Sequence, residues 1–247
     1  MTAALARRLV AEALGTALLA MAVIGSGIAA ARLSPGDVGL QLLENAVATA
    51  AALVAIILAL GPVSGAHLNP VVTIADRVLG GITTTEAAFY VVAQVVGGAL
   101  GAMIANVMFS LPVVELSTHT RSSGGLWVSE VVATFGLLLV IFGIVRSGRS
   151  TVAPFAVGTF IGGAYFFTSS TSFANPAVTL ARTLSNTFAG IAPGSVAPFV
   201  AAQVAGAALA VAAMWVLYPG LRAVADEART RLECRPTALS PALRSGS

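Results

Sequence analysis

Two short segments of the chain carry the same Asn-Pro motif, and their residues are the best placed for chemistry. The segments span 64–79 and 170–185, and each is polar before its motif and apolar for about ten residues after it. The motifs are Asn69-Pro70-Val71 and Asn175-Pro176-Ala177. Asparagine suits the N-cap of a helix and proline suits its first turn. Ten helical residues reach about 15 Å, half the thickness of a bilayer core, so each segment predicts a re-entrant half-helix.

The start of a half-helix inside a membrane has a specific chemistry. Its unpaired backbone N–H groups carry about half a positive charge, so two such ends facing each other would repel cations. The side-chain amides of Asn69 and Asn175 would donate hydrogen bonds between them. Non-helical backbone at this depth is tolerated only where it is buried in protein or lines a water-filled cavity. The motifs therefore predict a pore.

Two glutamates and one histidine are further candidate site residues. Glu12 and Glu130 lie inside apolar runs, where a carboxylate is costly unless it is satisfied. We interpret them as structural acceptors for N–H groups of the two motif loops, and a proton relay is the alternative. His67 lies two residues before Asn69. We interpret it as a structural histidine at the cytoplasmic mouth, with a gate or pH sensor as the alternative.

The composition indicates an integral membrane protein. The 247 residues are 57% hydrophobic and only 9% charged, with a mean hydropathy of +0.92. A soluble domain is about 25% charged, and a disordered chain is far less apolar. The net charge of +3 comes without a basic cluster, so we expect no nucleic-acid partner. Cys234 is the single cysteine, and we expect neither a disulfide nor a bound metal or cofactor.

Six apolar segments are long enough to cross a bilayer, which takes about 20 residues. They span about 8–30, 40–61, 86–110, 127–146, 152–169 and 196–218. Most of the arginines lie on the side of the N-terminus when these segments alternate in direction. The positive-inside rule therefore predicts a multi-pass protein of the inner (plasma) membrane with both termini in the cytoplasm. Residues 220–247 read as a cytoplasmic tail.

The chain also repeats itself. Glu12 matches Glu130, the first Asn-Pro motif matches the second, and Gln94 matches Gln203, all in the same order. The two copies span about 8–113 and 126–218, and together they form one channel domain over 1–219. Each copy holds three spans, which is an odd number, so the second copy must enter the membrane from the opposite side. This is an inverted repeat. Gly97 and Gly101 match Gly206 and Ala210, and small residues at this spacing predict close helix packing.

The paired motifs resemble the signature loops of the aquaporin family, the major intrinsic proteins. The matching segments read SGAHLNPVVTIA and FANPAVTLA, and the resemblance covers about residues 8–218. It implies an all-α membrane fold of six transmembrane helices plus two half-helices, embedded in the lipid bilayer. It also implies a pore in every protomer, a homotetramer and passive conduction of small neutral solutes. Val71 departs from the alanine that the family usually has there.

The resemblance further implies an outer constriction that four residues form. Counting from the motif asparagines places these residues at Thr49, Gly163, Ser172 and Val178. The family usually has arginine where this chain has Val178, and the nearest arginine, Arg182, lies one helical turn further on. We therefore expect a wide, uncharged filter that passes water, glycerol and trivalent metalloid acids such as arsenite, because pore diameter and lining donors decide selectivity.

Three other functions are alternatives. An ion-coupled secondary transporter can also have inverted repeats and broken helices, but only Glu12 and Glu130 are available for a coupling-ion site. A water-selective channel is a second alternative, against which the small filter residues argue. A membrane enzyme is the third, and the sequence offers no nucleophile–base pair for it.

Overall fold

The structure, a computed structural model, describes residues 2–219, and in this part it is built from helices and connecting loops. Six helices are long and apolar enough to cross a membrane. They are α1 (Ala3–Leu33), α2 (Val38–Ser64), α4 (Thr84–Met108), α5 (Gly124–Arg146), α6 (Ala153–Phe167) and α8 (Val196–Leu217). These helices confirm the six predicted spans. The predicted tail at 220–247, with Cys234, lies outside the described residues.

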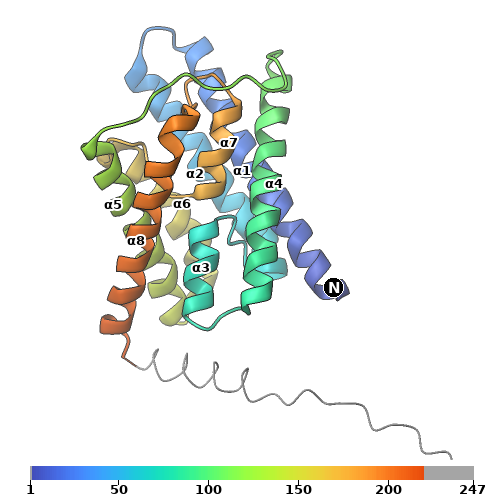
Figure 1. The fold of residues 1–247 in the computed structure, drawn as a ribbon, viewed down its shortest axis with the longest axis vertical. Coiled ribbons are helices and arrows are strands. Elements are labelled where there is room, and N and C mark those ends of the chain that lie inside the picture. Colours follow the sequence, from blue (N-terminus) through green and yellow to red (C-terminus); the bar gives the residue numbers. More distant parts are fainter. Residues whose placement is uncertain (1, 220–247) are drawn as a thin grey trace, which may run out of the picture.

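Two shorter helices follow the Asn-Pro motifs, as predicted. They are α3 (Pro70–Val78), with nine residues, and α7 (Pro176–Ala181), with six. Asn69 caps α3 and Asn175 caps α7, and a proline occupies the first turn of each. A short 3-10 helix (Arg182–Leu184) extends α7. Both start at mid-height in the bundle and run toward opposite ends (Figure 1). This arrangement confirms an inverted repeat.

The long helices pack in equivalent pairs in the two halves. Helix α1 packs against α4, and α5 packs against α8. Small residues permit both contacts: a Cβ atom at Gly97 or Gly101 would overlap backbone atoms of α1, and one at Gly206 would lie 2.5 Å from the carbonyl oxygen of Val131. A side chain at these positions would push the helices apart, so glycine sets how closely they approach.

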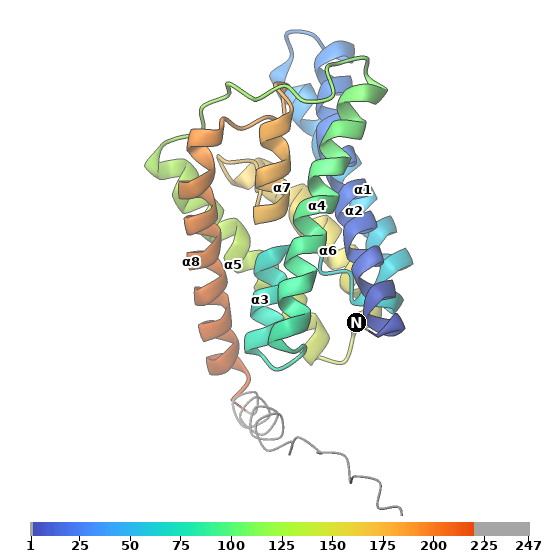
Figure 2. The same cartoon turned by 45° about the vertical axis from the view of Figure 1, so that its right-hand side comes forward.

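The two ends of the bundle are distinguished by where the first and last helices begin and end. Helix α1 begins and α8 finishes toward the same end, which we call the N-terminal end, and we call the opposite end the far end (Figure 2). Helix α3 runs toward the N-terminal end and α7 runs toward the far end. Between its two ends, α1 has apolar side chains on its outer face: Val10 is 57% exposed and Leu14 55%. Such surfaces suit contact with lipid or with another protein subunit.

Candidate functional site

Each Asn-Pro motif is preceded by a loop that a buried glutamate holds. In the first half this glutamate is Glu12 of α1, which is fully buried. Its Oε1 accepts hydrogen bonds from Ser64 Oγ at 2.7 Å and from the backbone N–H of His67 at 3.0 Å. Its Oε2 accepts from the backbone N–H of Leu68 at 2.7 Å and from Gln94 Nε2 at 2.8 Å. Four donors therefore satisfy this carboxylate inside an apolar bundle.

Glu130 of α5 does the same for the second loop. Its Oε1 accepts from Ser170 Oγ at 2.6 Å and from the backbone N–H of Phe173 at 2.9 Å. Its Oε2 accepts from the backbone N–H of Ala174 at 2.9 Å and from Gln203 Nε2 at 2.6 Å. The donor set repeats that of Glu12 in type and order. The glutamates thus lie where acceptors for the loop N–H groups are needed.

The loops held in this way have the same unusual backbone. Residues three and one before each asparagine have positive φ: Ala66 at 47° and Leu68 at 53°, then Ser172 at 52° and Ala174 at 46°. Left-handed backbone is costly for residues other than glycine and persists where its surroundings determine it. The bonds to the two glutamates provide that constraint. The result is two loops of matching shape ahead of α3 and α7.

The two capping asparagines connect the loops to each other. Asn69 Nδ2 donates to the carbonyl oxygen of Ala174 at 2.7 Å, and Asn175 Nδ2 donates to the carbonyl oxygen of Leu68 at 2.8 Å. Each asparagine Oδ1 accepts from backbone N–H groups of its own helix. An amide nitrogen carries two hydrogens, so each asparagine keeps a second N–H for another acceptor.

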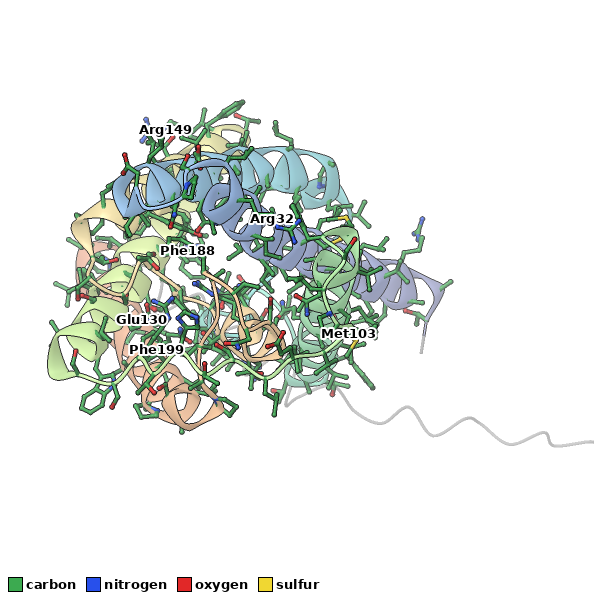
Figure 3. All side chains as sticks on the ribbon, turned by 90° about the horizontal axis from the view of Figure 1, so that it is seen from above. Arg32, Met103, Glu130, Arg149, Phe188 and Phe199 are labelled. Carbon is green, nitrogen blue, oxygen red and sulfur yellow. The ribbon has the colours of Figure 1, made fainter. Side chains whose placement is uncertain are left out.

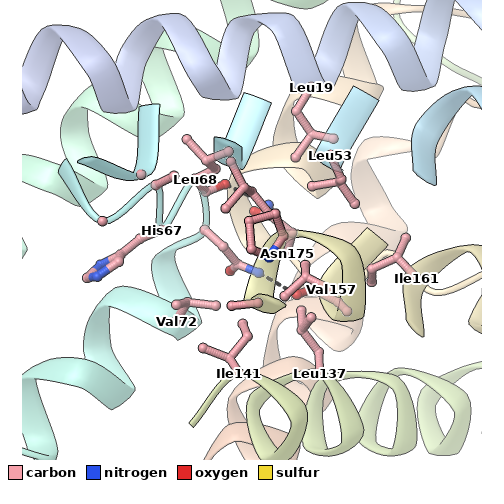
Figure 4. A pocket seen from close by; sticks show the side chains of 18 of the residues that line it. Leu19, Leu53, His67, Leu68, Val72, Leu137, Ile141, Val157, Ile161 and Asn175 are labelled. Carbon is pink, nitrogen blue, oxygen red and sulfur yellow. Dashed lines mark hydrogen bonds between the residues drawn. The ribbon is translucent and has the colours of Figure 1, made fainter. Parts of the chain in front are cut away.

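A single cavity of about 680 Å³ contacts both asparagines. Figure 4 shows Asn175 between His67 and Ile161, with Leu137 and Ile141 on another side. The lining is mostly apolar, and about a third of the residues that form it have polar or charged side chains. The rest of each motif is buried without lining the cavity; these residues are Pro70, Val71, Pro176 and Ala177.

Three of the four expected constriction residues line this cavity, and they are Thr49, Ser172 and Val178. Gly163 does not. Helix α6 turns it onto the exposed stripe that includes Phe155 and Phe166, because helical residues face the same way only every three or four positions.

Tyr165 lies at the cavity where Gly163 was expected. It is fully enclosed, and its hydroxyl lies 3.1 Å from Thr49 Oγ1. A large aromatic ring thus replaces the expected glycine at the far end of the cavity. The wall of the cavity beside Thr49 is therefore bulkier than the predicted set of small residues implies.

Arg182 also lines the cavity, which corrects the expectation of an uncharged constriction. It is only 3% exposed, and its guanidinium lies 3.4 Å from the centre of the Phe173 ring. Its Nε donates to the carbonyl oxygen of Ala189. Val178 lines the cavity, as expected for this position. The positive charge belongs to Arg182, which lies one helical turn further along the chain and lines the cavity as well. The far end of the cavity is therefore positively charged.

A second arginine, Arg121, donates to carbonyl groups on both sides of Ala189 in the same loop. Arg121 donates from Nε to the carbonyl oxygen of Gly190 at 2.9 Å and from a terminal nitrogen to that of Phe188 at 3.3 Å. Its guanidinium lies 5.2 Å from the Phe173 ring. Burial lowers the pKa of Arg121, although a guanidinium remains charged at neutral pH. Figure 3 views this end from above, with Phe188 labelled.

The N-terminal end of the cavity has different polar groups. His67 Nδ1 lies 3.2 Å from Thr73 Oγ1, and His67 Nε2 lies 3.8 Å from Asp76 Oδ2. The ring also contacts Tyr90 edge-on, with centroids 5.4 Å apart. His67 and Asp76 both line the cavity. The two ends therefore differ: a histidine and a carboxylate lie at one, and an arginine at the other.

Sequence reasoning missed Tyr165 as a site residue and noted Arg182 without placing it at the site. A signal existed for Arg182, because residues four apart on a helix share a face, so its spacing from Val178 favours the cavity. A weaker signal existed for Tyr165, since a hydroxyl in an apolar span needs a polar partner. Phe173, whose ring supports Arg182, had no distinguishing signal.

Comparison with known proteins agrees with this geometry. The sequence profile described as major intrinsic protein matches residues 1–172. The chain is 49% identical over 216 residues to the aquaglyceroporin AqpS of Rhizobium meliloti, covering 87% of this chain and 92% of that one. It is 31% identical to the probable aquaporin AqpM of Archaeoglobus fulgidus, covering 87% of this chain and 97% of that one.

A solved structure has the same fold. The aquaglyceroporin from Plasmodium falciparum superimposes with a TM-score of 0.66 at 22% identity, covering 89% of this chain and 99% of that one. The matched profile, the relatives and the shared fold all point to one family. The chain thus belongs to the major intrinsic protein family and is a multi-pass membrane channel for water and small solutes.

Proposed function

We propose that the protein conducts glycerol and other small uncharged solutes as well as water, and that Asn69 and Asn175 orient them in the pore. The observation that carries this proposal is one cavity that both half-helix starts contact and that is otherwise mostly apolar. A neutral polyol has an apolar carbon face and a polar hydroxyl face. The apolar wall of the cavity contacts the carbon face, and the free amide N–H groups of the two asparagines donate to the hydroxyl face.

The constriction supports solutes larger than water. Thr49, Ser172 and Val178 are small, and they leave room beside Tyr165. Trivalent metalloid acids such as arsenite are neutral polyhydroxy molecules of about the size of glycerol, so the same pore suits them. The Rhizobium meliloti relative is named an aquaglyceroporin, which supports glycerol as a solute.

Passive conduction fits the two glutamates better than ion coupling does. Glu12 and Glu130 each accept four hydrogen bonds and are fully buried. A coupling-ion site needs carboxylate oxygens that a cation or proton can reach and leave. We therefore propose that both are structural. His67, with Thr73 and Asp76 as neighbours, holds the N-terminal mouth.

The setting of the channel follows from the same reasoning. We propose that the protein spans the plasma membrane as a homotetramer with both termini in the cytoplasm, so that the far end is the outer mouth. The arginine bias supports this direction. The apolar outer faces of the long helices supply surface for contacts between protomers and with lipid. Mass determination in detergent tests the subunit number.

Stopped-flow permeability of proteoliposomes tests the function. Water, glycerol and arsenite are compared in vesicles with and without protein at matched lipid. We expect protein to speed all three, with rates proportional to the concentration gradient and unaffected by a proton gradient. Faster water alone would favour the water-selective alternative, and saturable uptake that follows the proton gradient would favour a coupled transporter.

A further inference from the structure

Arg182 is a buried cation whose donors the protein leaves largely unused. A guanidinium carries five N–H donors, and Arg182 spends one of them on the Ala189 carbonyl. Among residues 2–219, no acceptor contacts its two terminal nitrogens and no carboxylate forms a salt bridge with it. Its side chain lines the cavity, so the unused donors are available there.

The charged groups around Arg182 do not neutralise it. The Arg121 guanidinium lies 5.2 Å from the centre of the same Phe173 ring and adds a second positive charge. Glu130 is the acidic group that influences Arg182, but four donors already occupy its oxygens. A buried charge without a partner is costly, so this end of the cavity favours an anion.

A second feature belongs to the same part of the cavity, because Ser172 directly precedes Phe173, whose ring the Arg182 guanidinium contacts. Ser172 lines the cavity and is only 4% exposed, yet its Oγ has no hydrogen-bond partner within the described part of the chain. Buried hydroxyls are normally hydrogen-bonded, so an unpaired one on a residue that lines a cavity indicates a missing partner, which a turn of the side chain about its Cα–Cβ bond would let it reach. A hydroxyl can donate to an anion's oxygen as readily as to water.

We propose that the far end of the cavity binds a small, singly charged oxyanion through the Arg182 guanidinium and the Ser172 hydroxyl. A guanidinium presents parallel N–H groups that match two oxygens of one planar anion. A single charge fits because, of the two arginines beside Phe173, Arg182 lines the cavity while Arg121 donates to loop carbonyls. Small size fits because the large ring of Tyr165 forms one wall of this part of the cavity. This site extends the proposed conduction of neutral solutes and does not depend on it.

Nitrate is the probe, because it is planar, stays singly charged at any working pH and does not cross lipid as a neutral acid. Proteoliposomes are equilibrated with sodium nitrate or sodium gluconate on both sides at equal ionic strength. Water efflux is then driven by sucrose. Gluconate is too large for the site, and water as the readout keeps the test valid even if glycerol does not pass. A nitrate electrode records any efflux of the anion.

We expect nitrate to slow water flow saturably in the wild type, or to cross through the channel itself. Arg182→Gln should weaken either effect by roughly tenfold or more, since a lost charge-assisted hydrogen bond is worth at least that factor. Ser172→Ala should weaken it less, and Arg182→Lys should retain part of it.

Arg32→Gln is the matched control. Arg32 lies at the end of α1, exposed and outside the cavity, so this variant removes the same charge from the same end (Figure 3). We expect it to respond to nitrate as the wild type does. The proposal is overturned if nitrate neither slows water nor crosses in the wild type, or if Arg182→Gln responds unchanged. If Arg182→Gln does not fold, Ser172→Ala and Arg182→Lys decide, because unchanged responses in both would equally overturn it.

Discussion

The two halves of the molecule hold their motif loops in the same way but end the cavity in different ways. Glu12 and Glu130 accept equivalent sets of four hydrogen bonds, and the loops they hold have positive φ at equivalent positions. The cavity nevertheless has His67 and Asp76 toward the N-terminal end and Arg182 toward the far end.

This comparison separates the residues that hold the motif loops from the residues at the cavity ends, which we expect to decide which solutes pass. Each motif loop presents two backbone N–H groups at equivalent positions inside the bundle, so each half needs the same buried acceptor. Side chains at the cavity ends carry no such backbone requirement and are free to differ. Substitutions in the support should therefore act alike in both halves, whereas substitutions at a cavity end should change permeability from one half alone.

The largest effect is expected from replacing the buried glutamates. Glu12→Gln or Glu130→Gln turns one acceptor oxygen into a donor, which leaves two neighbouring donors unpaired at roughly 1–3 kcal/mol each. Folded yield in detergent, measured by size-exclusion chromatography, should fall several-fold for both variants. Glu115→Gln, in an exposed loop, should have normal yield. One glutamate variant that folds normally beside one that fails would break the equivalence of the two halves.

The next effect concerns the asparagines. Asp also caps helices well, so Asn69→Asp and Asn175→Asp keep the helix cap while each loses its Nδ2 hydrogen bond to the opposite loop, and the leak is measured on the fraction that folds. Each adds a negative charge where two half-helix starts meet, and this weakens the barrier to cations. Cation leak through proteoliposomes, followed with a sodium-sensitive dye, should rise in both variants to a similar degree. Leak that stays at the wild-type level in both would refute the electrostatic barrier at this place.

A cavity-end substitution should act differently. Val178→Arg adds bulk and charge beside Arg182 and Tyr165, and we expect the glycerol-to-water permeability ratio to fall by roughly tenfold, the effect of about 1.4 kcal/mol. Val178→Met adds length without charge and serves as the control, so a smaller fall there separates size from charge. An unchanged ratio in Val178→Arg would mean that this residue does not limit glycerol.

The smallest effect sharpens the comparison of supports. Thr73 Oγ1 donates to the Asn69 carbonyl oxygen at 3.0 Å, and Thr179 Oγ1 donates to that of Asn175 at 2.7 Å. Thr73→Val and Thr179→Val should each cost about 1 kcal/mol, measured as a modest fall in Tm. Thr73→Val should cost slightly more, since His67 also contacts that hydroxyl at 3.2 Å. Equal shifts would mean that the histidine contact adds nothing.

Most of the fold could be predicted because it rests on local rules. Apolar runs long enough to cross a bilayer located the six helices to within a few residues, and N-cap asparagines followed by proline located α3 and α7. The matched glutamates followed from the need for acceptors near unpaired N–H groups. The tail at 220–247 and the domain limits at 113 and 126 stay predictions.

The residues that line the cavity could be predicted only in part. Counting along the chain named Thr49, Ser172 and Val178, which line it, but it cannot show which face of α6 turns inward, and Gly163 lies on the outer face. The direction of the Arg182 side chain depends on its hydrogen bond to the Ala189 carbonyl oxygen, and no local sequence pattern predicts where that carbonyl lies. The sequence does not show which side chains of distant segments point into the same cavity.

The most direct test of conduction beyond water is the permeability of wild-type proteoliposomes to glycerol relative to water. We predict that protein raises glycerol permeability well above that of protein-free vesicles, that the rise scales with the amount of protein, and that a proton gradient leaves it unchanged. Vesicles in which protein raises water permeability while glycerol permeability stays at the protein-free level would contradict a channel for small polyols.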